Sequence, residues 1–139
     1  MNAIRTFIDT NILIYAFSAD EPVKRETAIK KINGCSAVIS TQIIKEFSNV
    51  LFKKTKLGIN AIHETITEIY SAMEVVNEDI NSIFDSFGLI KKYGYSFYDS
   101  LVIATALRSK CRVLLSEDFY NGQLIENKLK IVNPFVEVN

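Results

Sequence analysis

The sequence is poor in the residues that mark several protein classes. Its 139 residues include two cysteines, one histidine, two prolines and no tryptophan. Cys35 and Cys111 are far apart and lack metal-ligand spacing, so we expect a buried, reduced pair rather than a disulfide framework or a zinc site. With so few prolines and no repeat, linker or low-complexity tract, residues 1–139 are predicted to form one domain.

The sequence also lacks an excess of charge and a membrane-length apolar run. Lysine plus arginine and aspartate plus glutamate both number 16, which favours neither a polyanion-coating protein nor an acidic one. No apolar stretch approaches the length of a membrane span, and residues 1–5 do not have the architecture of a signal peptide. We therefore expect a cytoplasmic protein with no membrane contact.

Several catalytic motifs are missing as well. There is no glycine-rich phosphate loop, no serine-nucleophile motif and no cysteine-rich zinc pattern. The single histidine, His63, falls in a predicted amphipathic helix away from every acidic motif. We assign it no catalytic role.

What the sequence does have is a regular alternation of strand-like and helix-like periods. The pattern predicts a mainly parallel central sheet with helices on both faces, an α/β fold. Ser40 or Thr41 is expected to cap the third helix, and Asn60 the fourth. Strands are predicted at 4–8, 36–39, 74–76, 113–115 and 130–133, and helices at 11–16, 22–32, 42–56, 60–73, 79–93 and 96–109.

Two acidic residues follow buried strands of this predicted sheet. Asp9 closes the apolar run that ends at Ile8, and Asp118 comes shortly after the run that ends at Leu115. In α/β proteins, ligands bind at the carboxyl ends of the parallel strands. Both carboxylates are therefore predicted to lie at the ligand-binding edge.

Two further acids lie on predicted helix faces that are otherwise apolar. Glu46 shares a stripe with Ile43, Phe47 and Val50, and Asp99 lies on the face of Val102, Ile103 and Ala106. Carboxylates rarely face a core without a partner, and no lysine or arginine is placed to neutralise all four acids. If the fold gathers them, they need a cation, and oxygen-rich clusters suit Mg²⁺ or Mn²⁺.

Each acid also has a plainer explanation when it is taken alone. Asp9 can cap the helix that follows it, Ser96 and Asp99 fit a capping box, and Asp118 can belong to a polar turn. Glu46 is harder to explain in this way, because its neighbours at i−3, i+1 and i+4 are all apolar. Taken together, the four acids favour a metal site.

Four ordered motifs carry a family resemblance that spans almost the whole chain. Residues 7–11 (FIDTN), 39–47 (ISTQIIKEF), 95–101 (YSFYDSL) and 115–118 (LSED) are similar to the motifs of PIN-domain ribonucleases, especially the VapC-type toxins of type II toxin–antitoxin pairs. The resemblance implies a PIN-like fold and an acidic pocket that binds Mg²⁺ or Mn²⁺. Asp9, Glu46, Asp99 and Asp118 match the acidic positions as catalytic and metal-binding residues, and Asn11 and Ser116 match polar positions that support the site.

The resemblance implies an endoribonuclease that hydrolyses RNA phosphodiester bonds with metal-activated water. It also implies two protein partners, a small antitoxin whose tail blocks the acidic pocket and a second copy in a homodimer. The helices predicted at 22–32 and 42–56 are candidate docking surfaces. Tyr95 and Tyr98 lie close to Asp99 in sequence, and their rings are candidates for stacking unpaired bases.

Other functions remain open at this point. A non-toxin RNA-processing PIN nuclease would use the same pocket, and a catalytically silent RNA- or protein-binding module would keep the fold without metal. An aspartate-dependent phosphatase usually has a second aspartate two residues after the nucleophile, where this chain has Asn11. A receiver-like signalling domain needs paired early acids and a late lysine near the site, and neither is evident.

Overall fold

The fold is built on one six-stranded sheet. The computed structural model describes residues 3–136, so residues 1–2 and 137–139 of the expected domain lie outside its description. The strands are β1 (Arg5–Ile8), β2 (Ser36–Ser40), β3 (Glu74–Val76), β4 (Val113–Leu115), β5 (Leu124–Ile125) and β6 (Leu129–Val132). The helices are α1 (Thr10–Ala16), α2 (Pro22–Asn33), α3 (Thr41–Lys54), α4 (Ile59–Ala72), α5 (Ile80–Tyr93) and α6 (Phe97–Arg108).

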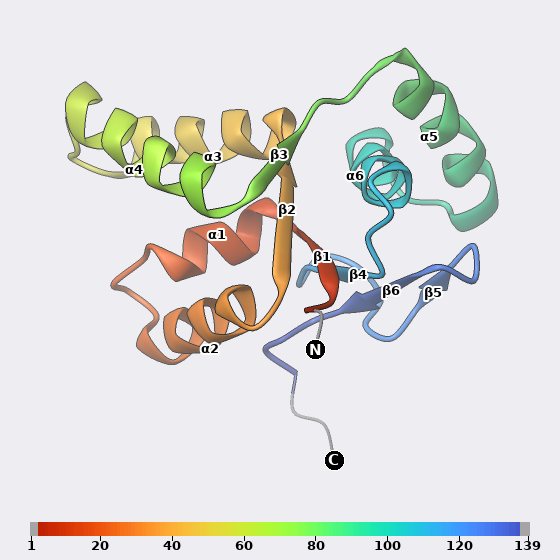
Figure 1. Cartoon of the computed structure of the whole chain (residues 1–139), viewed down its shortest axis with the longest axis horizontal. Helices are drawn as coiled ribbons and strands as arrows, with labels where there is room; N and C mark the ends of the chain where they lie inside the picture. The colour runs from red at the N-terminus through yellow and green to blue at the C-terminus, as the bar shows by residue number, and fades with distance from the viewer. Residues whose placement is uncertain (1–2, 137–139) are drawn as a thin grey trace.

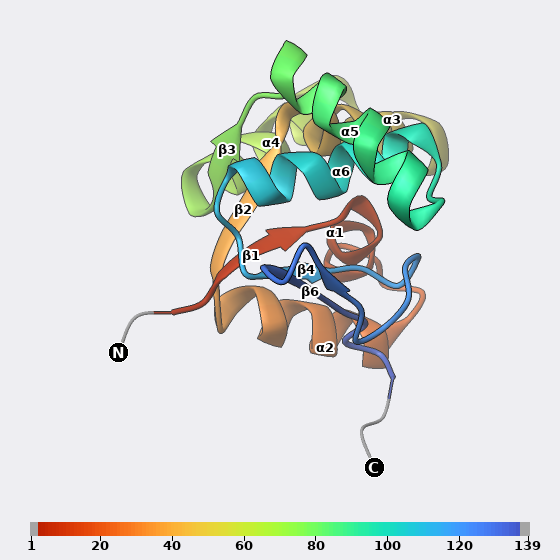
Figure 2. The same ribbon diagram turned by 90° about the vertical axis from the view of Figure 1, so that its right-hand side faces the viewer.

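The predicted α/β architecture is confirmed. The strand order is β3-β2-β1-β4-β6-β5, and every neighbouring pair is parallel except β5 with β6. Helix α2 lies on one side of the sheet, and α3 to α6 lie on the opposite side (Figures 1 and 2). Helix α1 packs against both α2 and α3.

Strand β1 lies in the middle of this sheet, and its second half is apolar, as a central strand requires. Phe7 and Ile8 are fully buried, as are Val38 on β2 and Leu114 on β4. Continuous apolar runs are typical of parallel strands covered on both faces. Phe7 pairs with Val38, and Ile8 pairs with Leu115, so the residues after Ile8 and Leu115 emerge side by side.

The local sequence sets most of the helix ends. The Ser40 hydroxyl accepts a hydrogen bond from the Ile43 N–H and caps α3, and the Ser96 hydroxyl caps α6 in the same way through Asp99. Between α5 and α6, Gly94 has a φ of 77°, a left-handed conformation that favours glycine. This turn fixes where α6 begins and therefore where Asp99 lies.

Some predicted boundaries are wrong. Helix α3 ends at Lys54 rather than at residue 56, and α4 begins at Ile59 with Gly58 as its N-cap rather than Asn60. The short strand β5 was not predicted. Its two residues pair with β6 in a hairpin, and such a brief segment has too little periodicity to stand out.

The helix predicted at 79–93 has apolar residues at helical spacing, but these do not form the buried face of α5. Ile80, Phe84 and Phe87 are exposed, whereas the buried residues of this helix are Ser82, Ser86 and Leu89. Helix α5 packs against α6, and small side chains allow the two helices to approach closely. Tyr70, at an apolar position of α4, is likewise 68% exposed.

The two cysteines are free, with Cys111 buried and Cys35 half-buried, and burial raises the pKa of both thiols. None of the helices within residues 3–136 combines the length and the hydropathy needed to cross a bilayer.

Candidate functional site

The parallel pairing of β1 and β4 brings Asp9 next to Ser116. The Asp9 N–H donates to the Leu115 carbonyl at 3.1 Å, which continues the pairing one residue beyond the strand. The Ser116 hydroxyl, fully buried, then donates to Asp9 Oδ2 at 2.7 Å. Asp9 Oδ1 accepts from the Thr10 N–H at 2.8 Å, so Asp9 also caps α1. The capping and the pocket interpretations of Asp9 are therefore compatible.

Asn11 connects Asp9 to Asp118. Its Nδ2 lies 3.3 Å from Asp9 Oδ2, 3.2 Å from Ser116 Oγ and 3.0 Å from Asp118 Oδ2. Its Oδ1 accepts from the Glu117 N–H at 3.3 Å. The Asn11 amide thus lies between two carboxylates, where it provides the positive end of a dipole.

Glu46 reaches the same region from α3. It is half-buried at the rim of the buried stripe of Ile43 and Phe47, so the prediction that it faces the core is corrected. Its carboxylate accepts from Thr10 Oγ1 at 2.7 Å and from Gln42 Nε2 at 2.9 Å. The Glu46 carboxylate is therefore neither fully buried nor without hydrogen-bond partners.

Sequence reasoning missed three residues of this region. Thr10 and Gln42 hold Glu46, and Glu78 accepts from Thr41 Oγ1 at 3.1 Å and from the Gln42 N–H at 3.2 Å. The Gln42–Glu46 pair was readable, because residues four apart share a helix face. Glu78 lies in the loop after β3, and only the tertiary fold places it at the start of α3.

Asp99 lies in the first turn of α6. Its backbone N–H donates to the Ser96 hydroxyl at 3.2 Å, which is the first half of the predicted capping box. Partial burial raises the pKa of the Asp99 carboxyl, and the charges of Asp118 and Glu46 raise it further, while the Ser96 hydroxyl lowers it. The cap therefore uses the backbone of Asp99, and the carboxylate belongs to the acidic group.

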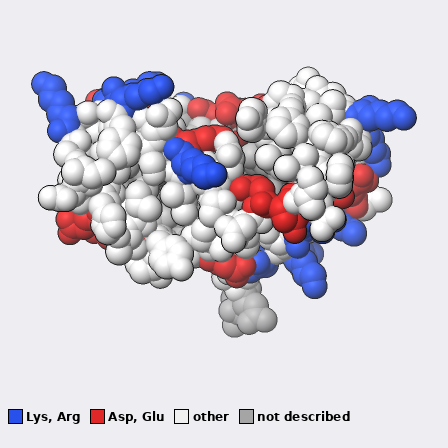
Figure 3. Space-filling view, turned by 90° about the horizontal axis from the view of Figure 1, so that it is seen from above, with Lys and Arg blue, Asp and Glu red and all other residues white. Residues whose placement is uncertain are grey.

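The four predicted acids act on one another electrostatically. Asp9 is 7% exposed, and its burial is the main reason that its pKa is raised to about 6. The hydrogen bonds from Ser116 and Thr10 lower this pKa, and the charges of Asp118 and Glu46 raise it. Within residues 3–136, the four ion pairs involve none of these acids. Figure 3 shows acidic atoms in the hollow between the helices, with basic atoms beside them.

The residues of this acidic pocket fit a hard divalent cation in their chemistry and charge. Carboxylate and hydroxyl oxygens surround Asp9, and mutual repulsion favours any cation that enters. In the described part of the chain, however, no three Asp, Glu, His or Cys side chains lie close enough to hold an ion as they are arranged. The amides of Asn11 and Gln42 occupy carboxylate oxygens. Metal binding would require the hydrogen bonds of these amides to break and the carboxylates to move closer together.

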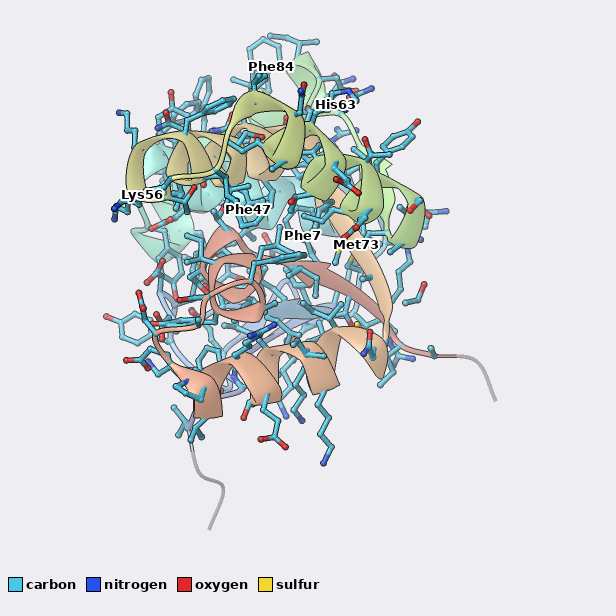
Figure 4. All side chains as sticks on the ribbon, turned by 90° about the vertical axis from the view of Figure 1, so that its left-hand side faces the viewer. Phe7, Phe47, Lys56, His63, Met73 and Phe84 are labelled. Carbon is cyan, nitrogen blue, oxygen red and sulfur yellow. The ribbon has the colours of Figure 1, made fainter. Side chains whose placement is uncertain are left out.

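The two candidate tyrosines have different surroundings. The Tyr95 hydroxyl donates to Gln123 Oε1 and accepts from the Tyr120 N–H, and its ring packs edge-on against Phe119 at 5.0 Å. Tyr95 thereby anchors the loop that follows Asp118. Tyr98 is 60% exposed next to Asp99, and its ring packs at a tilt against that of Phe97 with centroids 5.1 Å apart. His63 is exposed on α4, in the outer helix layer (Figure 4).

Comparisons with known proteins agree with this fold. The profile of the PIN domain matches residues 6–120. A toxin–antitoxin complex from Klebsiella pneumoniae has a TM-score of 0.72 and 20% identity, and the match covers 94% of this chain and 98% of that one. FitAcB from Neisseria gonorrhoeae has a TM-score of 0.69 and 14% identity, with 94% and 98% covered.

VapC20 from Mycobacterium tuberculosis, described as a toxin that cleaves the sarcin–ricin loop, has a TM-score of 0.65 and 15% identity, with 81% of this chain and 91% of that one covered. No curated protein matches the sequence. At these identities the solved structures establish a shared fold.

We expect Asp9→Asn to stabilise the metal-free protein in a pH-dependent way. The folded-state pKa of about 6 lies above the ordinary value of 3.8, so the folded state binds more protons between these values. Ionisation of Asp9 therefore costs stability as the pH rises through this window, by about 3 kcal/mol in total. Asparagine keeps the cap but carries no charge. Urea unfolding with a chelator should show the advantage of the variant growing from about pH 4 to pH 7.

Asp20→Asn, in the exposed loop before α2, is the matched control and should show no such trend. An Asp9→Asn protein that is less stable than the wild type at neutral pH would contradict the predicted cost of the buried charge.

Proposed function

This chain belongs to the PIN-domain family, and we propose that it is a Mg²⁺- or Mn²⁺-dependent endoribonuclease that acts as the toxin of a toxin–antitoxin pair. The observation that carries the proposal is the buried Asp9, whose pKa is raised to about 6 by its burial and by the charges of Asp118 and Glu46, and which has no lysine or arginine partner among the described residues. The solved toxin–antitoxin complex from Klebsiella pneumoniae and VapC20, which cleaves the sarcin–ricin loop, share the fold and support the same activity.

We assign the metal to Asp9 and Asp99, with Glu46 and Asp118 binding it directly or through water. A divalent ion there would supply a water of lowered pKa and would neutralise charge on the scissile phosphate. Ser116 donates to Asp9 Oδ2 and fixes its orientation, and Asp9 would give up its proton on metal binding. The Asn11 amide, which donates to Asp9 and Asp118 in this structure, would then be available to donate to a phosphate oxygen.

The surroundings of the pocket agree with water as the nucleophile. The chain has one histidine, and His63 is exposed on the outer helix layer (Figure 4), so no imidazole is placed to deprotonate a ribose 2′-hydroxyl. Tyr98, exposed next to Asp99, is the side chain best placed to stack on an unpaired base near the cut.

We further propose that an antitoxin segment docks between α1, α2 and α4. A cavity of about 340 Å³ lies there, lined by Phe17, Ile29, Ile69 and Met73 among others. Phe17 is 44% exposed and Ile29 is 38% exposed, so two of its walls present apolar surface. An amphipathic helix fits such a groove.

A second copy of the chain is the partner proposed for the exposed face of α5. Phe84, Phe87 and Phe97 form a row, with ring centroids 6.2 Å and 6.3 Å apart, and each is more than one third exposed. Near this row, Arg108 is paired with Asp85, so these two charges offset each other. A neutral aromatic strip suits a homodimer contact better than it suits a polyanion.

The activity is tested by incubating the protein and a mixed-sequence RNA with Mn²⁺. We expect cleavage products with 5′-phosphate and 3′-hydroxyl ends, and a loss of at least about a hundredfold in Asp99→Asn, because an unpaired metal ligand has been removed. Asp20→Asn should cleave like the wild type. Products with 2′,3′-cyclic phosphate ends would contradict the proposal, because the ribose hydroxyl would then have attacked. Metal binding without cleavage of any RNA would favour a silent binding module.

The antitoxin groove is tested by co-expression with the product of the neighbouring reading frame. Ile29→Glu places a charge in the apolar groove and should weaken the complex by at least tenfold in titration calorimetry. The exposed Val23→Glu, on the same helix but outside the groove, should not. Equal affinities of the two variants would exclude this groove.

The dimer is tested by light scattering coupled to size exclusion. The wild type should elute as a dimer and Phe84→Glu/Phe87→Glu as a monomer, since buried charges would face each other in the dimer. Tyr70→Glu, an equally exposed aromatic position on α4, should remain dimeric. A double variant that still dimerises would show that another face is used.

A further inference from the structure

Glu117 lies between Ser116 and Asp118 but does not belong to the acidic pocket. Its carboxylate accepts from the Tyr15 hydroxyl at 2.7 Å through Oε1, and Lys24 Nζ lies 3.4 Å from its Oε2. Lys24 Nζ also lies 3.2 Å from the Tyr15 hydroxyl oxygen. The loop after β4 therefore reaches α1 and α2 through one side chain.

The same loop is held by a second residue of α1. Asn11 Oδ1 accepts from the Glu117 N–H, and Asn11 Nδ2 donates to Asp118. Asn11 and Tyr15 are four residues apart, so they share one face of α1 and hold the loop at two points. Tyr15 binds the side chain of Glu117, and Asn11 binds its backbone.

An aromatic side chain shields this group from solvent. Phe135 packs edge-on against Tyr15 with ring centroids 4.9 Å apart. Lys24 Nζ lies 4.6 Å from the Tyr15 ring centroid and 5.3 Å from that of Phe135. The side chains of Lys24 and Glu117 are only 34% and 25% exposed, so their contact is better protected than an ordinary surface ion pair.

We propose that Tyr15, Lys24 and Glu117 form a clamp that positions Asp118 for metal binding. The clamp turns the Glu117 carboxylate away from the pocket and fixes the loop on which Asp118 is carried. Asp118 itself is exposed. Its N–H donates to Ser116 Oγ at 3.1 Å and its carboxylate accepts from Asn11, and beyond these two contacts its position depends on this loop. The inference rests on the proposed function, because it assigns the three residues a role in metal affinity.

The decisive variant is Lys24→Met, because the clamp and simple electrostatics predict opposite results. Removal of a nearby positive charge should, by Coulomb's law alone, tighten the binding of Mn²⁺. If Lys24 instead holds the Asp118 loop, its removal should raise the Mn²⁺ dissociation constant, by about tenfold for the loss of an outer-sphere partner. Tyr15→Phe changes no charge and should weaken binding to a similar extent.

Lys92→Met is the matched control, since Lys92 forms a surface pair with Glu126 at 2.7 Å outside the pocket. It should leave the dissociation constant unchanged. Titration calorimetry measures affinity, and thermal unfolding of the metal-free protein measures any structural contribution. Tighter binding in Lys24→Met, or a lower melting temperature in Tyr15→Phe with unchanged affinity, would overturn the clamp.

Amide hydrogen exchange in the metal-free protein separates this inference from the proposed function. The clamp predicts exchange at least tenfold faster at Glu117 and Asp118 in Tyr15→Phe, and unchanged exchange there in Lys92→Met. If the wild type binds no Mn²⁺, the proposed function fails, and exchange alone then decides whether the three residues hold the loop. Unchanged exchange in Tyr15→Phe would overturn the clamp whatever the metal result.

Discussion

The parallel pairing of β1 with β4 is the constraint on which the acidic pocket depends. Because Ile8 and Leu115 are paired, Asp9 and Ser116 leave the sheet together and form their 2.7 Å hydrogen bond. Asn11, two residues later on α1, then reaches both Asp9 and Asp118. A shift of one residue in this register would turn these side chains to the wrong faces of the sheet and separate them.

The carboxylates of the acidic pocket repel one another, and this repulsion destabilises the metal-free fold. The metal-free protein holds it in check with neutral donors, namely the hydroxyls of Ser116 and Thr10 and the amides of Asn11 and Gln42. Each of these donors occupies an oxygen that a cation would otherwise use. Stability and metal binding therefore compete for the same atoms, as is common at functional sites.

Much of the fold could be predicted from the sequence, because local chemistry decides it. The apolar runs of the central strands, the serine caps of α3 and α6 and the glycine after α5 all encode their structure in a few residues. The exposed face of α5 could not be predicted in this way. Its phenylalanines recur at helical spacing, but packing against α6 decides which face is buried. The small side chains of Ser82 and Ser86 lie on that face.

The gathering of the acids could be predicted in part. Asp9 and Asp118 follow from the rule that ligands meet strand ends, whereas the rim position of Glu46 depends on Thr10, which lies 36 residues earlier. The roles of Glu78 and Glu117 also depend on contacts across the fold. The match of the PIN-domain profile to residues 6–120 confirms the family.

The central claim is that a cation replaces the proton of Asp9. It is tested most directly by Mn²⁺ calorimetry at about pH 6 and pH 8, in buffers with different ionisation enthalpies. We predict tighter binding at the higher pH, with a fraction of a proton released per ion near pH 6, where Asp9 titrates, and almost none at pH 8. Binding that is independent of pH and releases no proton would contradict the account.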